Sequence, residues 1–227
     1  MPGRSASLLL LVANLVYATS YVATRLTLDA VPPTTLALAR LALGAAILLP
    51  LARAEGPAPA PRRGDRARVA WMGALGFGAA FALGNLGVAH STATNAALLI
   101  VVEPVALMAL GPRLLGERLT RGEAVGGALA VVGAVLVVVD GVPGLSRALV
   151  PHWRGDVLLV LSGLAYAAYS LLGRGVLARA TPLGVTARSM AWGAAVTAPL
   201  AGLEWLAGAR PSPTPAAVAG TLYLAVV

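Results

Sequence analysis

The chain has 227 residues, of which 58% are hydrophobic and 11% are charged, and its mean hydropathy is +0.82. A soluble domain of this length cannot bury so much apolar surface, so the composition excludes an ordinary globular protein and indicates a membrane protein. The chain contains no cysteine, which excludes disulfides and thiol-bound metals, and we expect no metal or other cofactor.

Apolar stretches of about 20 residues recur along the whole chain, and each is long enough to cross about 30 Å of hydrocarbon as a helix. They lie at about 7–28, 35–53, 69–89, 93–113, 123–139, 156–173 and 189–207, and an eighth begins near 215. The sequence therefore predicts an all-α integral membrane protein with about seven full spans and the start of an eighth.

Two segments of the chain are similar to each other. Residues 8–52 align without a gap with residues 157–201, at an offset of 149, and 15 of these 45 positions are identical. The identities include the run Gly44-Ala45-Ala46, which matches Gly193-Ala194-Ala195. A chain this rich in Ala and Leu would match itself by chance at roughly five of these positions, so the excess indicates a duplicated unit.

The duplication suggests a domain plan. We predict a first repeat of five spans over 1–139, an external linker over 140–155 and an incomplete second repeat over 156–227. Because five spans precede the linker, the second copy would be inserted upside down, as in secondary transporters. With the 149-residue offset, the second repeat should end near 139 + 149 = 288, which is 61 residues beyond residue 227. A C-terminally truncated, transport-inactive fragment is therefore an alternative for this chain.

The basic residues are distributed unevenly between the two sides of the predicted membrane. All 17 are Arg and give a net charge of +8. Counted from a cytoplasmic N-terminus, twelve lie on that side, four lie on the other side, and Arg40 lies within a span. This bias follows the positive-inside rule, so we expect a multi-pass protein of the cell's inner (plasma) membrane with a cytoplasmic N-terminus. The charge needs no polyanionic partner, and we expect no nucleic acid.

Two ionisable residues, Arg40 and Glu103, lie deep within predicted spans. Each costs about 2.5–3.5 kcal/mol at mid-membrane, so each should face the bundle interior and have a partner, and we predict that they pair with each other. Pro104 directly follows Glu103 and should break the helix there. A carboxylate beside a broken helix at half depth is typical of substrate and proton sites in transporters. A buried ion pair that only sets the helix register is the alternative.

Polar and aromatic residues form two further stripes. Asn14, Tyr17 and Tyr21 share one face of the first span, and Tyr166 and Ser170 lie on the corresponding face of its copy. We expect these stripes to line a central cavity, although a tyrosine near a membrane face is usually an interfacial anchor. Trp192 in the seventh span is either an aromatic wall of this cavity or lipid-facing.

A stripe of small residues runs along the fifth span. Its members are Gly122, Gly126, Ala130 and Ala134, which recur every fourth residue and allow another helix to approach closely. We expect the stripe to pack within the bundle, and a homodimer through it is the alternative.

Two motifs resemble those of a known family. They are Glu103-Pro104-Val105 and, further on, Gly116-Glu117-Arg118-Leu119-Thr120 followed by a Gly-rich helix. Together they resemble the fourth-to-fifth span signature of the EamA-like family in the drug/metabolite transporter superfamily, and the Glu-Pro form is similar to its amino-acid exporter branch. The resemblance implies ten spans in two inverted five-helix repeats, and efflux of small metabolites.

We therefore expect a secondary transporter that exports a small metabolite, such as an amino acid, by alternating access. Its partners would be that small-molecule substrate, protons if Glu103 couples transport to them, and the lipid bilayer; a facilitator without coupling is the alternative. An intramembrane enzyme would need a motif such as His-Glu-x-x-His or Gly-x-Ser-x-Gly, and neither occurs in the sequence. We do not expect an enzyme.

Overall fold

The computed structural model describes residues 16, 19–55, 64–116, 118–140 and 152–226, and all regular structure in these ranges is helical. Residues 19–27 form a helix. The elements after it are α2 (Pro33–Ala54), α3 (Asp65–Trp71), the π-helix η1 (Met72–Ala79), α4 (Ala80–His90), α5 (Ala93–Leu99), α6 (Val102–Leu115), α7 (Arg121–Asp140), α8 (Trp153–Leu177), α9 (Pro182–Leu206) and α10 (Pro215–Val226). The predicted all-α class is confirmed.

Five helical stretches in the described ranges are long and apolar enough to cross a membrane. They are Pro33–Ala54, Asp65–His90, Ala93–Leu114, Arg121–Asp140 and Trp153–Leu177. These five agree with predicted spans, with bounds that shift by a few residues. Helix α9, with 25 residues, is not among these five, and α10 has 12 residues. Half of the predicted span 7–28 lies outside the described residues, so the total number of spans stays a prediction.

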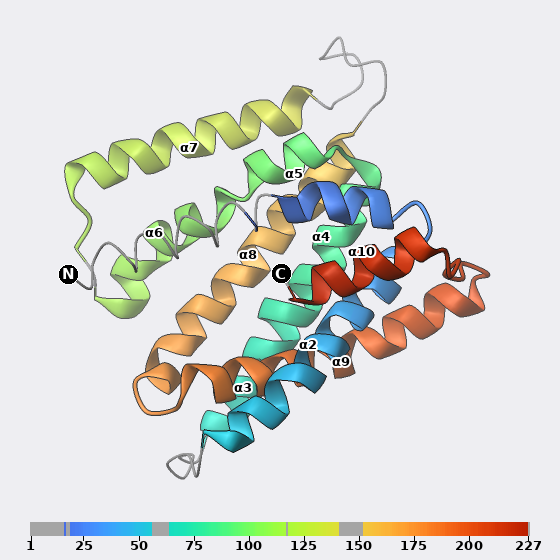
Figure 1. The fold of residues 1–227 in the computed structure, drawn as a ribbon. Coiled ribbons are helices and arrows are strands. Elements are labelled where there is room, and N and C mark those ends of the chain that lie inside the picture. Colours follow the sequence, from blue (N-terminus) through green and yellow to red (C-terminus); the bar gives the residue numbers. More distant parts are fainter. Residues whose placement is uncertain (1–15, 17–18, 56–63, 117, 141–151, 227) are drawn as a thin grey trace, which may run out of the picture.

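Helix α8 lies in the middle of the bundle. It packs against α5, α6 and α7 on one side and against α3, η1 and α4 on the other, while α2, α9 and α10 lie beyond (Figure 1). Elements α3, η1 and α4 form one continuous stretch, which contacts both α8 and α9. We call this stretch, Asp65–His90, the central stretch.

Glycines let the central stretch approach its neighbours closely. A Cβ added to Gly76 would overlap the Cβ of Tyr169 in α8, and one added to Gly73 would overlap Ser189 and Trp192 in α9. At the end of α4, a Cβ on Gly87 would lie 2.7 Å from Leu159 of α8. These distances are shorter than van der Waals contact, so the packing requires glycine at these positions.

Helices α2 and α9, which belong to the two similar segments, pack against each other in antiparallel directions. Glu204 near the end of α9 accepts hydrogen bonds of 2.9 Å from the backbone N–H groups of Thr34 and Thr35 in the first turn of α2. Its carboxylate supplies the negative charge that a helix N-terminus favours. An inverted repeat would require this antiparallel arrangement, and the repeat plan itself stays a prediction.

The expected helix break at Pro104 is present. Helix α5 ends at Leu99, α6 begins at Val102, and the Glu103 N–H donates to the carbonyl of Ile100 at 3.3 Å, three residues back. Proline has no N–H to donate to that carbonyl in the regular helical pattern, so the chain makes a tighter turn instead. The break places Glu103 in the first turn of α6.

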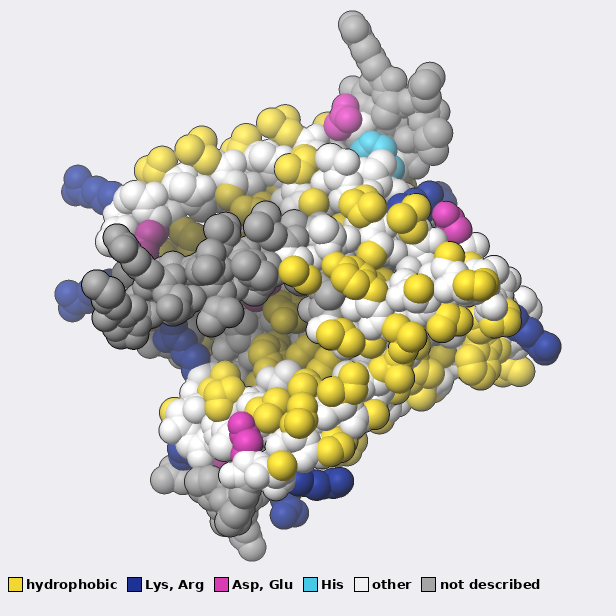
Figure 2. Space-filling view, in the orientation of Figure 1, with side chains coloured by type: hydrophobic (Ala, Val, Ile, Leu, Met, Phe, Trp, Pro, Cys, Tyr) yellow, Lys and Arg dark blue, Asp and Glu magenta, His cyan; other side chains and the backbone are white. Residues whose placement is uncertain are grey.

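Hydrophobic side chains cover much of the outer surface, whereas the Arg side chains lie at its edges (Figure 2). Helix α7 contributes to this surface because none of its residues is buried. A Cβ on Gly122 or Gly126 would meet no atom within 4 Å, while Ala134 packs against a buried cluster around Leu159. The small-residue stripe is thus open at Gly122 and Gly126 and packed within the described bundle at Ala134, and a homodimer through it stays a prediction.

We predict that Gly76→Ala lowers the yield of folded protein, because the new methyl would collide with Tyr169. Gly126→Ala is the matched control: it adds the same methyl in open space and removes a helix-destabilising glycine, so its yield should equal or exceed that of the parent chain. Size-exclusion chromatography in mild detergent measures both. Equal monodisperse yields of the two variants would contradict the packing argument.

Candidate functional site

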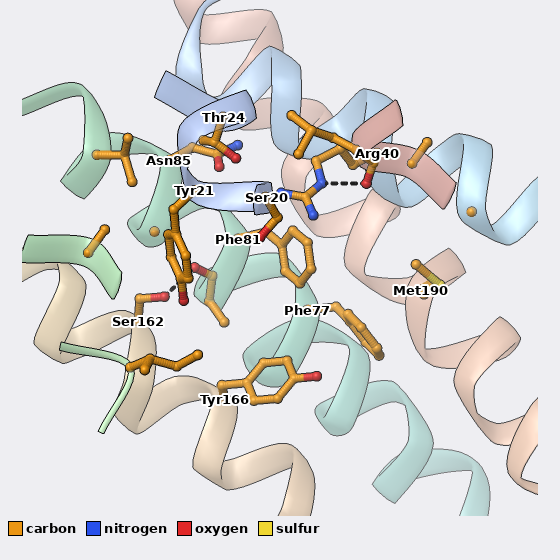
Figure 3. Close-up of a pocket in the computed structure, with 18 of the residues that line it drawn as sticks. Ser20, Tyr21, Thr24, Arg40, Phe77, Phe81, Asn85, Ser162, Tyr166 and Met190 are labelled. Atoms are coloured by element: carbon orange, nitrogen blue, oxygen red, sulfur yellow. Dashed lines mark hydrogen bonds between the residues drawn. The ribbon is translucent and has the colours of Figure 1, made fainter. Parts of the chain in front are cut away.

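A cavity of about 560 Å³ lies between the central stretch and the helices around it. Figure 3 shows Tyr21, Phe81, Phe77 and Tyr166 around one space, with Arg40 on one side of it and Ser162 on another. The described lining residues come from the helix at 19–27 and from α2, η1, α4, α5, α6, α8, α9 and α10. Both similar segments therefore contribute to one cavity.

Arg40 lies in the second turn of α2 and is half-buried. Its Nε donates to the carbonyl of Leu224 in α10 at 2.9 Å, and its guanidinium carbon lies 4.7 Å from the centre of the Phe81 ring. The carbonyl and the negative face of the ring both favour the positive charge. Arg40 thus brings a fixed cation into the cavity wall and links α2 to α10.

Glu103 reaches the same cavity from the start of α6. Its Oε1 accepts a hydrogen bond of 3.3 Å from the Ser170 hydroxyl of α8. A single hydroxyl donor satisfies only part of a carboxylate's acceptor capacity, so Glu103 can accept a further hydrogen bond or bind a cation. Arg40 and Glu103 are the two charged residues among the described lining residues, and they have opposite signs.

The rings beside these charges form a connected group. Phe77 in η1 lies 5.0 Å from Tyr169 and 6.3 Å from Tyr166, both edge to face, and 5.8 Å from Phe81. Such contacts add about 0.5–1.5 kcal/mol per pair beyond simple burial and hold the rings in defined orientations. The wall between Arg40 and the α8 side of the cavity is therefore aromatic and rigid.

The structure brings together most of the described residues that the sequence predicted for the site. Tyr21, Arg40, Glu103 and Tyr166 line the cavity, and Ser170 joins them through its hydrogen bond to Glu103. The contacts given above for Arg40 and for Glu103 are to different groups, and their direct pairing stays a prediction.

Four predicted residues do not belong to this described arrangement. Pro104 is exposed and lies outside the lining. Trp192 packs beside Gly73 of η1, is 51% exposed and lies outside the cavity lining, so of the two alternatives its position corresponds to the lipid-facing one. Asn14 and Tyr17 lie outside the described residues.

Several lining residues were not predicted from the sequence. Phe77, Phe81 and Asn85 follow one another at intervals of four residues and all face the cavity. The Asn85 side-chain amide donates to the Pro33 carbonyl at 3.0 Å, and the Ser162 hydroxyl donates to the Ala80 carbonyl at 2.7 Å. The four-residue spacing in a predicted span was the signal that could have identified this face.

A bundle of long apolar helices around a cavity with two opposite charges is the arrangement expected of a membrane transporter. Comparison with known families agrees. Residues 4–139 match the EamA-like transporter family, and the chain belongs to that family.

Two of three similar curated proteins carry transporter names. The chain is 32% identical over 213 residues to a probable terminal-alkyne amino-acid exporter of Streptantibioticus cattleyicolor, covering 93% of this chain and 68% of the relative. It is 37% identical over 193 residues to an uncharacterised protein of Pseudomonas aeruginosa, covering 82% of this chain and 61% of that protein. An uncharacterised transporter of Archaeoglobus fulgidus is 28% identical over 220 residues, covering 97% and 74%.

The chain thus spans between about three fifths and three quarters of the length of these relatives. No solved structure matches it significantly.

We predict that Arg40→Met lowers the thermal stability in detergent by several degrees. The change removes the hydrogen bond to Leu224 and the contact with Phe81 but keeps an apolar stem. A hydrogen bond from a charged group contributes about 1.5–3 kcal/mol. Arg53→Met on the exposed end of the same helix is the matched control and should change the midpoint little. Equal midpoints, read from tryptophan fluorescence during heating, would contradict the role of Arg40 as a link.

Proposed function

We propose that the protein exports a small zwitterionic metabolite of the amino-acid type across the plasma membrane by alternating access. The observation that carries the proposal is the cavity, in which Arg40 and Glu103 are the only charges among the described lining residues and the remaining wall is mostly apolar. Opposite charges at different points of a mostly apolar cavity favour a ligand with a complementary pair of charges.

The chemistry of the lining fits an amino acid with an apolar side chain. A carboxylate is the natural partner of the Arg40 guanidinium, and an ammonium group is that of the Glu103 carboxylate. Phe77, Tyr166 and Met190 offer an apolar and aromatic surface for the side chain. The name of the Streptantibioticus cattleyicolor relative, a probable amino-acid exporter, supports this cargo.

Glu103 also offers a way to couple export to a proton gradient. A proton and the substrate ammonium group would compete for the same carboxylate, because protonation removes the negative charge that holds the cation. Proton entry on one side would then release the substrate there. The arginine bias of the sequence supports a cytoplasmic N-terminus for this exporter.

The cargo proposal predicts that a ligand must carry both charges. In vesicles that contain the protein, uptake of labelled leucine should be inhibited by other apolar amino acids. Leucinamide lacks the carboxylate and 4-methylpentanoate lacks the ammonium group, so each would make only one of the two charge contacts. Each should inhibit at least about tenfold more weakly than an apolar amino acid. Equal inhibition by all three compounds would refute the zwitterion requirement.

The coupling proposal predicts that Glu103→Gln abolishes the dependence of transport on a proton gradient, because the amide cannot exchange a proton near neutral pH. Glu123→Gln is the matched control: it changes an exposed carboxylate of α7 that bonds to Thr120, and gradient dependence should persist. Gradient-driven transport by Glu103→Gln at the rate of the parent chain would remove Glu103 from the coupling step. Transport by the parent chain without any gradient dependence would instead indicate a facilitator.

A further inference from the structure

A second polar cluster lies at the end of the bundle where α4, α5 and α8 meet. Its centre is Asp156 in the first turn of α8, whose side chain is fully buried. The carboxylate accepts hydrogen bonds from the Ser91 hydroxyl at 2.5 Å and from the Asn95 amide at 3.1 Å, and it lies 2.6 Å from His152 Nδ1. We call these four residues the Asp156 network and this end of the bundle the His152 face.

The Asp156 network ties two separate parts of the chain together. Ser91 lies in the turn between α4 and α5, and Asn95 lies in the first turn of α5. His152 and Asp156 lie at the start of α8, where His152 is the N-cap residue. A buried carboxylate is stable only while donors surround it, so each member of the network holds the others in place. The turn and the start of α8 cannot separate unless this network breaks.

A layer of apolar side chains lies directly beneath the network. Val88 is three residues before Ser91, and Leu159 is three residues after Asp156, so each lies about one helical turn deeper. Both belong to one buried cluster with Ala96, and all three line the cavity. The cavity is therefore separated from the His152 face by one apolar layer with the Asp156 network above it.

A different contact joins the central stretch and α8 at the opposite end of the bundle. Asp65 at the start of α3 forms an ion pair of 2.9 Å with Arg179, just beyond the end of α8. The central stretch and α8 are thus tied at both ends, once by the Asp156 network and once by this ion pair. A path to the cavity between them on either face requires the tie on that face to open.

We propose that the Asp156 network is the lock that closes the transport cavity at the His152 face, with Val88, Ala96 and Leu159 as the seal beneath it. The proposal rests on the proposed function only in taking the cavity as the transport route. It makes Asp156 a gating residue, with no contact to the substrate.

The absence of cysteine from the sequence makes a direct test available. Ser20→Cys places a single thiol in the cavity lining at a site that is 5% exposed. A membrane-impermeant maleimide is added from the His152 face, and its rate of reaction is measured with and without Asp156→Ala. Loss of the Asp156 carboxylate should favour a form that is open at the His152 face, and labelling at position 20 should accelerate about tenfold or more.

Asp65→Ala is the matched control, since it removes the other buried aspartate at the opposite end. It should leave labelling from the His152 face unchanged and raise labelling from the other face. Ser189→Cys serves as a second reporter, because Ser189 is fully buried and lies outside the cavity lining. It should stay unreactive in every variant if the fold is intact.

Should Asp156→Ala fail to fold, Ser91→Ala decides the question, because it removes one donor and keeps the carboxylate. Faster labelling at position 20 alone supports the lock. Unchanged labelling at position 20 in the folded variants would overturn it. Faster labelling at both positions 20 and 189 would also overturn it, because the network would then only hold the fold together. The assay needs no transport, so it can support the lock even if the cargo or coupling predictions fail.

Discussion

The close approach of the central stretch to α8 and α9 is the constraint on which the described structure depends. Glycines on the packed faces of this stretch allow its backbone to touch both neighbours, and the larger residues Phe77, Phe81 and Asn85 occupy the remaining face. Helix association in a membrane relies on such packing, because lipid provides no hydrophobic driving force between helices. Small residues let two faces of the central stretch pack closely, and the large side chains on its third face line the cavity.

Much of the fold could be predicted from the sequence because lipid imposes a simple rule. Every backbone polar group in the hydrocarbon must be satisfied within its own segment, so long apolar stretches become helices, and Pro104 marks a real break between α5 and α6. How the helices rotate about their axes was harder to predict. The stripe that begins at Gly122 is open along its first turns, and Trp192 turns outward, because hydropathy reports depth but not which neighbour a face meets.

The parts of the candidate site that could be predicted from the sequence were its charged residues. Arg40 and Glu103 stood out because charged groups within spans are costly, and both line the cavity. Asp156 did not stand out, since an aspartate near the end of an apolar stretch looks like an ordinary loop residue. Its burial depends on Ser91 and Asn95, which are more than 60 residues away in the sequence. Only tertiary structure could reveal that these residues meet.

The π-helix η1 has a consequence for how such a protein can change through evolution. A π-helix closes its hydrogen bonds over five residues instead of four, so the stretch Met72–Ala79 holds more residues per turn than the α-helices on either side of it. Losing one residue there would convert the segment toward α-helical geometry and rotate the side chains on one side of it relative to those on the other. The wall that carries Phe77 and Phe81 can therefore be re-aimed by a change in chain length alone, without any substitution among the residues that face the cavity.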